Sequence, residues 1–120
     1  MHILLGIGDA DDGLRALERV VSRAQTAGDD LTVAVYSDGA TPLDELVARV
    51  HDRLDELDFD ATVEEVDGDP GGKIVELAER EDVDRIALPG GERSPLGKIR
   101  LDRVTEFVLL NASISVTLIR

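Results

Sequence analysis

The segment PGGERSPLGKIRLDR, residues 89–103, combines permissive backbone with positive charge. Glycines let backbone N–H groups approach an anion closely, and a following helix N-terminus favours negative charge. Four of the chain's 13 basic residues also lie within it. This combination is typical of a phosphate-binding loop, and the alternative is a plain strand-to-helix connection whose arginines pair with nearby acids. The residues concerned are Gly90, Gly91, Gly97, Arg93, Ser94, Lys98, Arg100 and Arg103.

A second group of chemically capable residues is the acidic cluster Asp9, Asp11 and Asp12. Three carboxylates at the end of a buried strand can hold Mg²⁺ or carry out acid–base chemistry. They can equally cap the helix that follows, where the N-terminal dipole favours acids. We expect capping, and we predict no metal site.

The remaining candidate catalytic residues do not form a constellation. His2 and His51 lie on different predicted elements, and neither follows a strand. No serine stands in a G-x-S-x-G elbow with a histidine placed to activate it. The chain has no cysteine, which excludes thiolate catalysis and cysteine-based zinc sites. We therefore predict no catalytic residue and a protein that is not an enzyme.

The overall charge restricts the class of partner. Acidic residues number 26 against 13 basic ones, giving a net charge of −13, and the acids are spread along the whole chain. Such a surface disfavours nucleic-acid binding, which needs a basic footprint, and indicates adaptation to a salt-rich cytoplasm. No apolar run approaches a membrane span and no signal-peptide pattern opens the chain. We expect one cytoplasmic domain over residues 1–120, without a membrane or nucleic-acid partner.

Strands and helices alternate along the sequence. Apolar or alternating runs predict five strands at residues 2–8, 31–36, 61–66, 83–89 and 115–120. Helical spacing predicts a first helix that Gly28 ends, a second with Thr41 as N-cap and Pro42 at its first position, and a third that Asp69 and Pro70 open. A fourth helix is expected to turn three residues inward: Val104, Phe107 and Val108.

This βα alternation predicts a parallel sheet with helices on both faces. Ligands bind such sheets beyond the carboxyl ends of the strands, where the strand order reverses. The loop after the first strand (residues 6–12) and the loop after the fourth (residues 89–97) should meet there. The glycine-rich segment therefore lies in the expected place for a ligand.

Three stretches carry a resemblance to a known family: ILLGIG, GDPGGKIVELAEREDVDRIALPGG and RSPLGKIRLDRVTEFVLLNASISVTLIR. Their order and content resemble the universal stress protein family over essentially the whole chain. The resemblance implies an α/β fold with a five-stranded parallel sheet of order 3-2-1-4-5, similar to the adenine-nucleotide alpha hydrolases. It also implies a homodimer that pairs through the last strand, with Ile114, Val116, Leu118 and the exposed face of the fourth helix in the interface.

The ATP-binding branch of that family carries G-x-x-G, nine residues, then G-[ST]. On this sequence the four signature positions fall at Pro89, Glu92, Asp102 and Arg103, so all four depart from the pattern. An aspartate that the branch places at the end of the first strand is here Gly8, with Asp9 beside it. The resemblance therefore implies a degenerate nucleotide motif.

We predict a non-enzymatic, stress-response regulatory homodimer resembling a haloarchaeal member of the family, with a degenerate pocket and protein partners that the sequence does not name. The alternative is a member that binds ATP with Mg²⁺ or a related nucleotide through the loops after the first and fourth strands. Its binding residues would be Gly6, Ile7, Gly8, Asp9, Val35, Leu88, Gly90, Gly91, Arg93, Ser94, Gly97, Arg103 and Val104.

Overall fold

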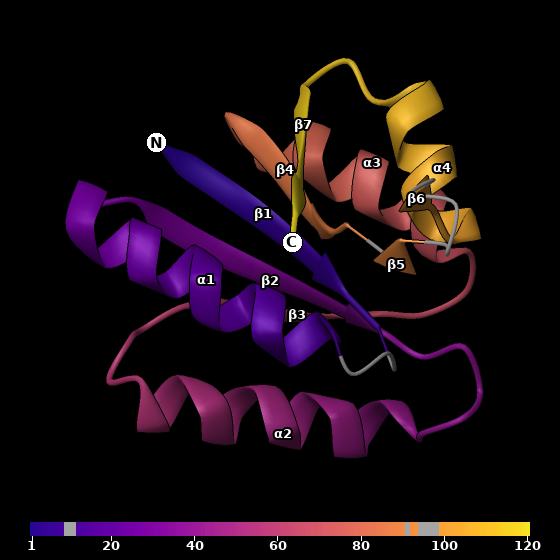
Figure 1. The fold of residues 1–120 in the computed structure, drawn as a ribbon. Coiled ribbons are helices and arrows are strands. Elements are labelled where there is room, and N and C mark those ends of the chain that lie inside the picture. Colours follow the sequence, from indigo (N-terminus) through magenta and orange to yellow (C-terminus); the bar gives the residue numbers. More distant parts are fainter. Residues whose placement is uncertain (9–11, 91, 94–98) are drawn as a thin grey trace.

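Five parallel strands form one sheet in the order β3–β2–β1–β4–β7 (Figure 1). The computed structural model describes residues 1–8, 12–90, 92–93 and 99–120. The predicted order 3-2-1-4-5 is confirmed, because β7 is the fifth strand of the sheet. The strands are β1 His2–Ile7, β2 Asp30–Tyr36, β3 Thr62–Val66, β4 Arg85–Pro89 and β7 Ser115–Ile119.

Two helices cover each face of the sheet (Figure 1). One face carries α1 (Asp12–Ala27) and α2 (Leu43–Glu56), and the other carries α3 (Pro70–Arg80) and α4 (Arg103–Asn111). None of the helices in the described part of the chain has the length and apolar character needed to cross a bilayer.

The strands supply two hydrophobic cores because successive side chains point to opposite faces. In β1, Leu5 and Ile7 pack under α1 and α2, whereas Leu4 packs under α3 and α4. Aliphatic side chains dominate both cores, as the near absence of aromatic residues requires. Burial on both faces explains why the central strands are continuous apolar runs.

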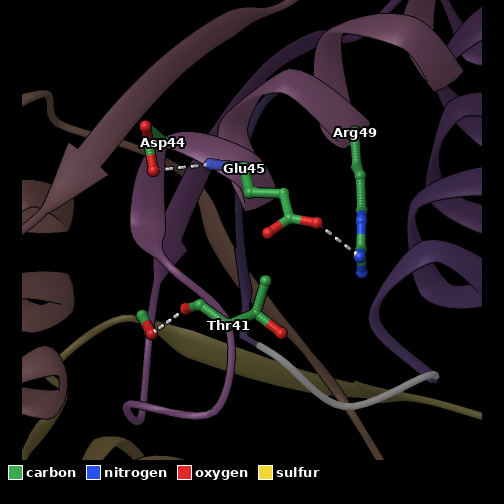
Figure 2. A network of polar contacts seen from close by, with 5 residues as sticks. Thr41, Asp44, Glu45 and Arg49 are labelled. Atoms are coloured by element: carbon green, nitrogen blue, oxygen red, sulfur yellow. Dashed lines mark hydrogen bonds and ion pairs between the residues drawn. The ribbon is translucent and has the colours of Figure 1, made fainter.

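The start of α2 differs from the prediction. The N-cap is Pro42 rather than Thr41, and Pro42 makes no capping hydrogen bond through its side chain. The Thr41 carbonyl instead accepts a hydrogen bond from the Ser37 hydroxyl, which keeps Thr41 in the preceding loop. In the first turn, Asp44 Oδ1 accepts from the Glu45 N–H at 3.0 Å, and Glu45 pairs with Arg49 at 3.0 Å (Figure 2).

Other predicted helix ends are confirmed. Gly28 follows α1 with a positive φ of 72°, a conformation that favours glycine, and its N–H donates to the Ala24 carbonyl. Asp69 is the N-cap of α3 with Pro70 at its first position, although the Asp69 side chain makes no capping hydrogen bond.

The fourth helix is less buried than predicted. Val108 is fully buried and Val104 is half-buried, but Phe107 is 39% exposed, so the prediction that it points inward is wrong. Phe107 lies against Gly71 of α3 at the outer rim of the helix pair.

A short antiparallel hairpin that the sequence did not predict follows β4. It pairs β5 (Glu92–Arg93) with β6 (Ile99–Arg100). Two-residue strands carry no detectable alternation, which is why the pattern of the sequence does not indicate them.

Candidate functional site

The strand order reverses between β1 and β4. β1 pairs with β2 on one side and with β4 on the other, so the chain leaves neighbouring strands in opposite directions at this point. The carboxyl ends of β1 and β4 therefore lie next to each other, at the end of the strands where parallel α/β proteins bind ligands. We call this place the carboxyl edge, and its described boundaries are Gly8, Tyr36, Gly90 and Asp102.

Four of the predicted nucleotide-binding residues lie inside the sheet, beneath the carboxyl edge. Ile7 and Val35 are buried under α1 and α2, and Leu88 is buried under α3 and α4. A Cβ atom at Gly6 would lie 2.9 Å from Ile74 Cδ1 and 3.0 Å from Leu88 Cδ2. Gly6 thus lets α3 pack closely on the sheet, which is a structural reason for the glycine.

Tyr36 covers the end of β1. A Cβ atom at Gly8 would lie 2.5 Å from Cε2 and 2.8 Å from Cζ of the tyrosine ring, and Tyr36 is only 7% exposed. Any larger residue in place of Gly8 would collide with this ring. Sequence reasoning missed Tyr36, although an aromatic residue that ends a strand in a chain with so few aromatics was an available signal.

Gly90 links the end of β4 to the end of β7. Its N–H donates to the Ile119 carbonyl at 2.7 Å, and a Cβ atom would lie 2.9 Å from Arg120 Cγ. The glycine permits the end of β7 to approach the loop after β4. Its N–H is therefore already used within the protein and does not point toward a ligand.

Asp102 occupies the N-terminus of α4. Its Oδ1 accepts a hydrogen bond from the Thr105 N–H at 2.7 Å, and its backbone carbonyl accepts from the Glu106 N–H at 3.0 Å. The carboxylate is thus an N-cap, placed where the helix dipole favours negative charge. Arg103 is exposed and Val104 is half-buried in the first turn.

The other predicted ligand residues are only partly covered by the structure. Asp9, Gly91, Ser94 and Gly97 lie outside the described residues, as does Asp11. Arg93 belongs to β5, and the description of that strand extends only to its backbone. Asp12 opens α1, in agreement with a place in the first turn of the helix. Across the residues that the structure describes, no three acidic or histidine side chains are grouped to hold a metal ion.

The two histidines lie away from the carboxyl edge. His2 begins β1, and its Nε2 lies 2.8 Å from Thr32 Oγ1, at the amino end of the sheet. His51 is exposed on α2. His2 and His51 therefore lie on different elements, β1 and α2, which agrees with the sequence prediction.

β7 forms one edge of the sheet, and in the described part of the chain only β4 pairs with it. Val116 and Leu118, together with Ile114 just before the strand, are half-buried and pack against the core under α3 and α4. Only part of the surface of these three side chains is therefore accessible to a partner. The backbone of β7 on the side away from β4 is also available for strand pairing.

Comparisons with known proteins agree on one family. A model of the universal stress protein family matches residues 1–120. No protein with curated function matches the sequence.

Solved structures give the same result for the fold. A universal stress protein from Archaeoglobus fulgidus is 23% identical, with a TM-score of 0.75 over 100% of this chain and 98% of that one. A universal stress protein in complex with cAMP is 22% identical, with a TM-score of 0.77 over 100% and 96%. A family protein from Arabidopsis thaliana with AMP bound is 17% identical, with a TM-score of 0.69 over 99% and 90%.

Proposed function

Because this chain belongs to the universal stress protein family, we propose that it is a non-enzymatic regulatory member whose triphosphate position is closed by its own Asp102 carboxylate. The observation that supports this most strongly is the 2.7 Å hydrogen bond from the Thr105 N–H to Asp102 Oδ1. In the family's ATP-binding pattern, a small residue stands at the position of Asp102, which leaves the helix N-terminus open to phosphate.

Two physical effects oppose a phosphate at this place. The carboxylate already satisfies an N–H that would otherwise be available to an anion at the start of α4. A triphosphate would also meet the negative charge of Asp102 and be repelled by it, although Asp102 is exposed and solvent reduces this repulsion. Arg103 follows directly and offsets part of this repulsion, but it is exposed and solvent screens it.

The rest of the carboxyl edge supports the same proposal. The Gly90 N–H donates a hydrogen bond to the Ile119 carbonyl. At the end of β1, the Tyr36 ring lies against Gly8. Two glycines that resemble parts of a ligand loop thus serve contacts within the protein. These contacts support the proposal that the chain does not hold ATP with Mg²⁺ in the family's manner.

The second candidate function is binding of a nucleotide monophosphate. It is favoured by the similar structures described as complexes with cAMP, AMP and dAMP. A monophosphate carries less negative charge toward Asp102 than a triphosphate does, so the same carboxylate opposes it less. Competition among AMP, cAMP and ATP in one titration series separates the two candidates, because only the second predicts saturable binding of a monophosphate.

The regulatory role would be exercised by a homodimer that pairs through β7. A free strand edge offers unsatisfied backbone groups to a second copy, and a two-fold contact between identical edges is self-complementary. The acidic composition fits work in a salt-rich cytoplasm, where screening reduces the repulsion between two copies that each carry −13.

The test of the proposal is the double variant Asp102→Gly/Arg103→Ser, which restores the family's small pair. Isothermal titration with ATP and Mg²⁺ in molar KCl should show binding at least about tenfold tighter than in the unchanged protein, equivalent to about 1.4 kcal/mol. Equal heats from both proteins would contradict the role given to Asp102. Absence of phosphate release from ATP by either protein is expected of a non-enzymatic member, and steady turnover would refute that part.

A further inference from the structure

A groove lies between the start of α3 and α4, and none of its described lining residues belongs to β7. Its volume is about 590 Å³, within the range of protein sites that bind ligands. We call it the α3–α4 groove, and its apolar wall consists of Val104, Phe107 and Leu110 from α4 with Pro70 and Gly71 from α3. Asp102 does not line it, so the groove is separate from the contact that closes the triphosphate position.

The apolar wall is unusually exposed. Val104, Phe107 and Leu110 are spaced three residues apart, which places them along one stripe of the helix. Phe107 is 39% exposed and Leu110 is 78% exposed. Among the described residues, three of the four large hydrophobic side chains that are exposed belong to this one short helix, the third being Leu109. A helix that is apolar on nearly all sides is normally covered.

Close packing at the floor of the groove fixes its shape. A Cβ atom at Gly71 would lie 2.8 Å from Phe107 Cδ1, so the absence of a side chain lets the ring lie directly on α3. The Phe107 ring therefore lies in a defined position against α3, and the exposed Leu110 extends the apolar wall by one turn of α4.

The rim of the groove is acidic. Asp38, Asp69 and Glu106 line it together with one basic residue, Arg103. The Asp69 carboxylate stays at the start of α3, where a Cβ atom at Gly72 would lie 2.8 Å from its Oδ2. Asp38 is held in the loop after β2, where its Oδ1 accepts from the Ala40 N–H at 3.0 Å. Among the described side chains that line the groove, three carboxylates against one guanidinium give the rim a net negative charge.

This charge selects among the possible occupants. A second copy of the chain would bring further acids to an acidic rim, a repulsion that salt reduces, and the proposed homodimer already places that copy at β7. A bilayer surface is commonly anionic and would be repelled in the same way. A segment with an apolar stripe and flanking lysines or arginines matches both the wall and the rim.

We propose that the α3–α4 groove is a docking site for a basic, amphipathic helical segment of another protein. The apolar stripe of that segment covers Phe107 and Leu110, and its basic flanks face Asp69 and Glu106. This names the chemistry of the partner through which the proposed regulatory role would act. Its test is nevertheless independent, because the peptide is titrated into the unchanged protein and into groove variants that all keep Asp102 and Arg103.

The probe is a short synthetic peptide with leucines spaced three and four residues apart and lysines at both flanks. We expect saturable chemical-shift changes in the ¹⁵N-labelled full chain at Gly71, Val104, Phe107 and Leu110, at the lowest KCl concentration in which the chain stays folded, because molar salt would screen the charges under test. A peptide with glutamates in place of the lysines is the charge control. Shifts of equal size with both peptides, or no saturable shifts with the lysine peptide, would overturn the proposal.

Matched variants localise the binding. Leu110→Ser should weaken the peptide dissociation constant by about tenfold, whereas Leu109→Ser, on the same helix but outside the groove lining, should leave it unchanged. Leu110 is mostly exposed, so its replacement should not impair folding, which thermal melting checks. Equal loss in both variants would overturn the proposal.

A second pair of variants tests the rim. Asp69→Asn/Glu106→Gln should weaken the lysine peptide several-fold, and Asp52→Asn/Asp55→Asn removes two exposed charges from α2 as the control. Equal effects of both pairs would contradict a role for the rim. Two further results would replace the proposed occupant: self-association that Leu110→Ser abolishes, indicating a second copy, and flotation of the protein with anionic vesicles, indicating a membrane.

Discussion

Replacement of Asp102 by alanine should destabilise the protein through the start of α4. The change removes the acceptor of the 2.7 Å hydrogen bond from the Thr105 N–H, and Thr105 is only 2% exposed. Loss of an N-cap side chain costs about 1 kcal/mol, within a range of roughly 0.5 to 2. Loss of a negative charge at a helix N-terminus adds about 0.3 to 1 kcal/mol. The free energy of unfolding should therefore fall by about 1.3 to 2 kcal/mol.

Asp69 provides a matched control for this prediction. It is the N-cap of α3, but its side chain makes no capping hydrogen bond. Asp69→Ala should lose only the interaction of the charge with the helix dipole, about 0.3 to 1 kcal/mol. The two aspartates thus separate the hydrogen bond from the charge.

The assay is urea unfolding of the unchanged protein, Asp102→Ala and Asp69→Ala. All three are measured at one protein concentration and one KCl concentration, because the urea midpoint of a dimer depends on protein concentration. Asp102→Asn keeps an acceptor oxygen and should recover most of the loss. Equal destabilisation by Asp102→Ala and Asp69→Ala would refute the claim that Asp102 caps α4 in solution.

Three further predictions test other parts of the structure. Gly8→Ala should cost about 1 to 3 kcal/mol in unfolding free energy, because the new Cβ would lie 2.5 Å from the Tyr36 ring; thermal melting in the Tyr36→Leu background should show a smaller cost, and an unchanged cost would mean that the ring is not the obstacle. The melting temperature should rise as KCl increases, because salt screens a net charge of −13, and a constant melting temperature in dilute buffer and in molar salt would contradict salt adaptation. Light scattering should give twice the chain mass of 13.0 kDa, and Ser115→Asp on the exposed start of β7 should shift the protein toward monomer while Ser22→Asp on α1 does not; a monomeric unchanged protein would exclude the dimer.

Most of the fold was predictable because the signals were local and repeated. The runs that became β1, β2 and β4 are apolar over several residues, since each strand is buried on both faces. Gly28 and Pro70 marked helix ends through backbone conformation, which depends little on the rest of the chain.

The predictions for Thr41 and Phe107 were wrong because contacts with other parts of the chain decide the position of both residues. Threonine is a common N-cap residue. The Thr41 carbonyl, however, accepts a hydrogen bond from the Ser37 hydroxyl, and α2 begins two residues later at Leu43. Phe107 fits the helical stripe, but the space beneath that side of α4 is taken by the backbone of α3 at Gly71. Neither arrangement can be read from residue spacing, because both depend on contacts between elements.

The candidate site shows the same division. The sequence placed Asp102 at a signature position and indicated a negative charge opposed to phosphate. The structure adds that this carboxylate accepts a hydrogen bond from the Thr105 N–H. An acid directly before a helical pattern is a known N-cap signal, so the contact could have been inferred, whereas the Tyr36 ring over Gly8 required the packed structure.

The most direct test of the central claim is a calorimetric titration of the unchanged protein with ATP and Mg²⁺ in molar KCl, preceded by a search for nucleotide carried through purification. A closed triphosphate position predicts no co-purified ATP and no saturable heat below about millimolar concentration, which corresponds to less than about 4 kcal/mol of binding free energy. A micromolar dissociation constant, or ATP released from the purified protein, would contradict it, because the Asp102 carboxylate would then have to share the start of α4 with phosphate.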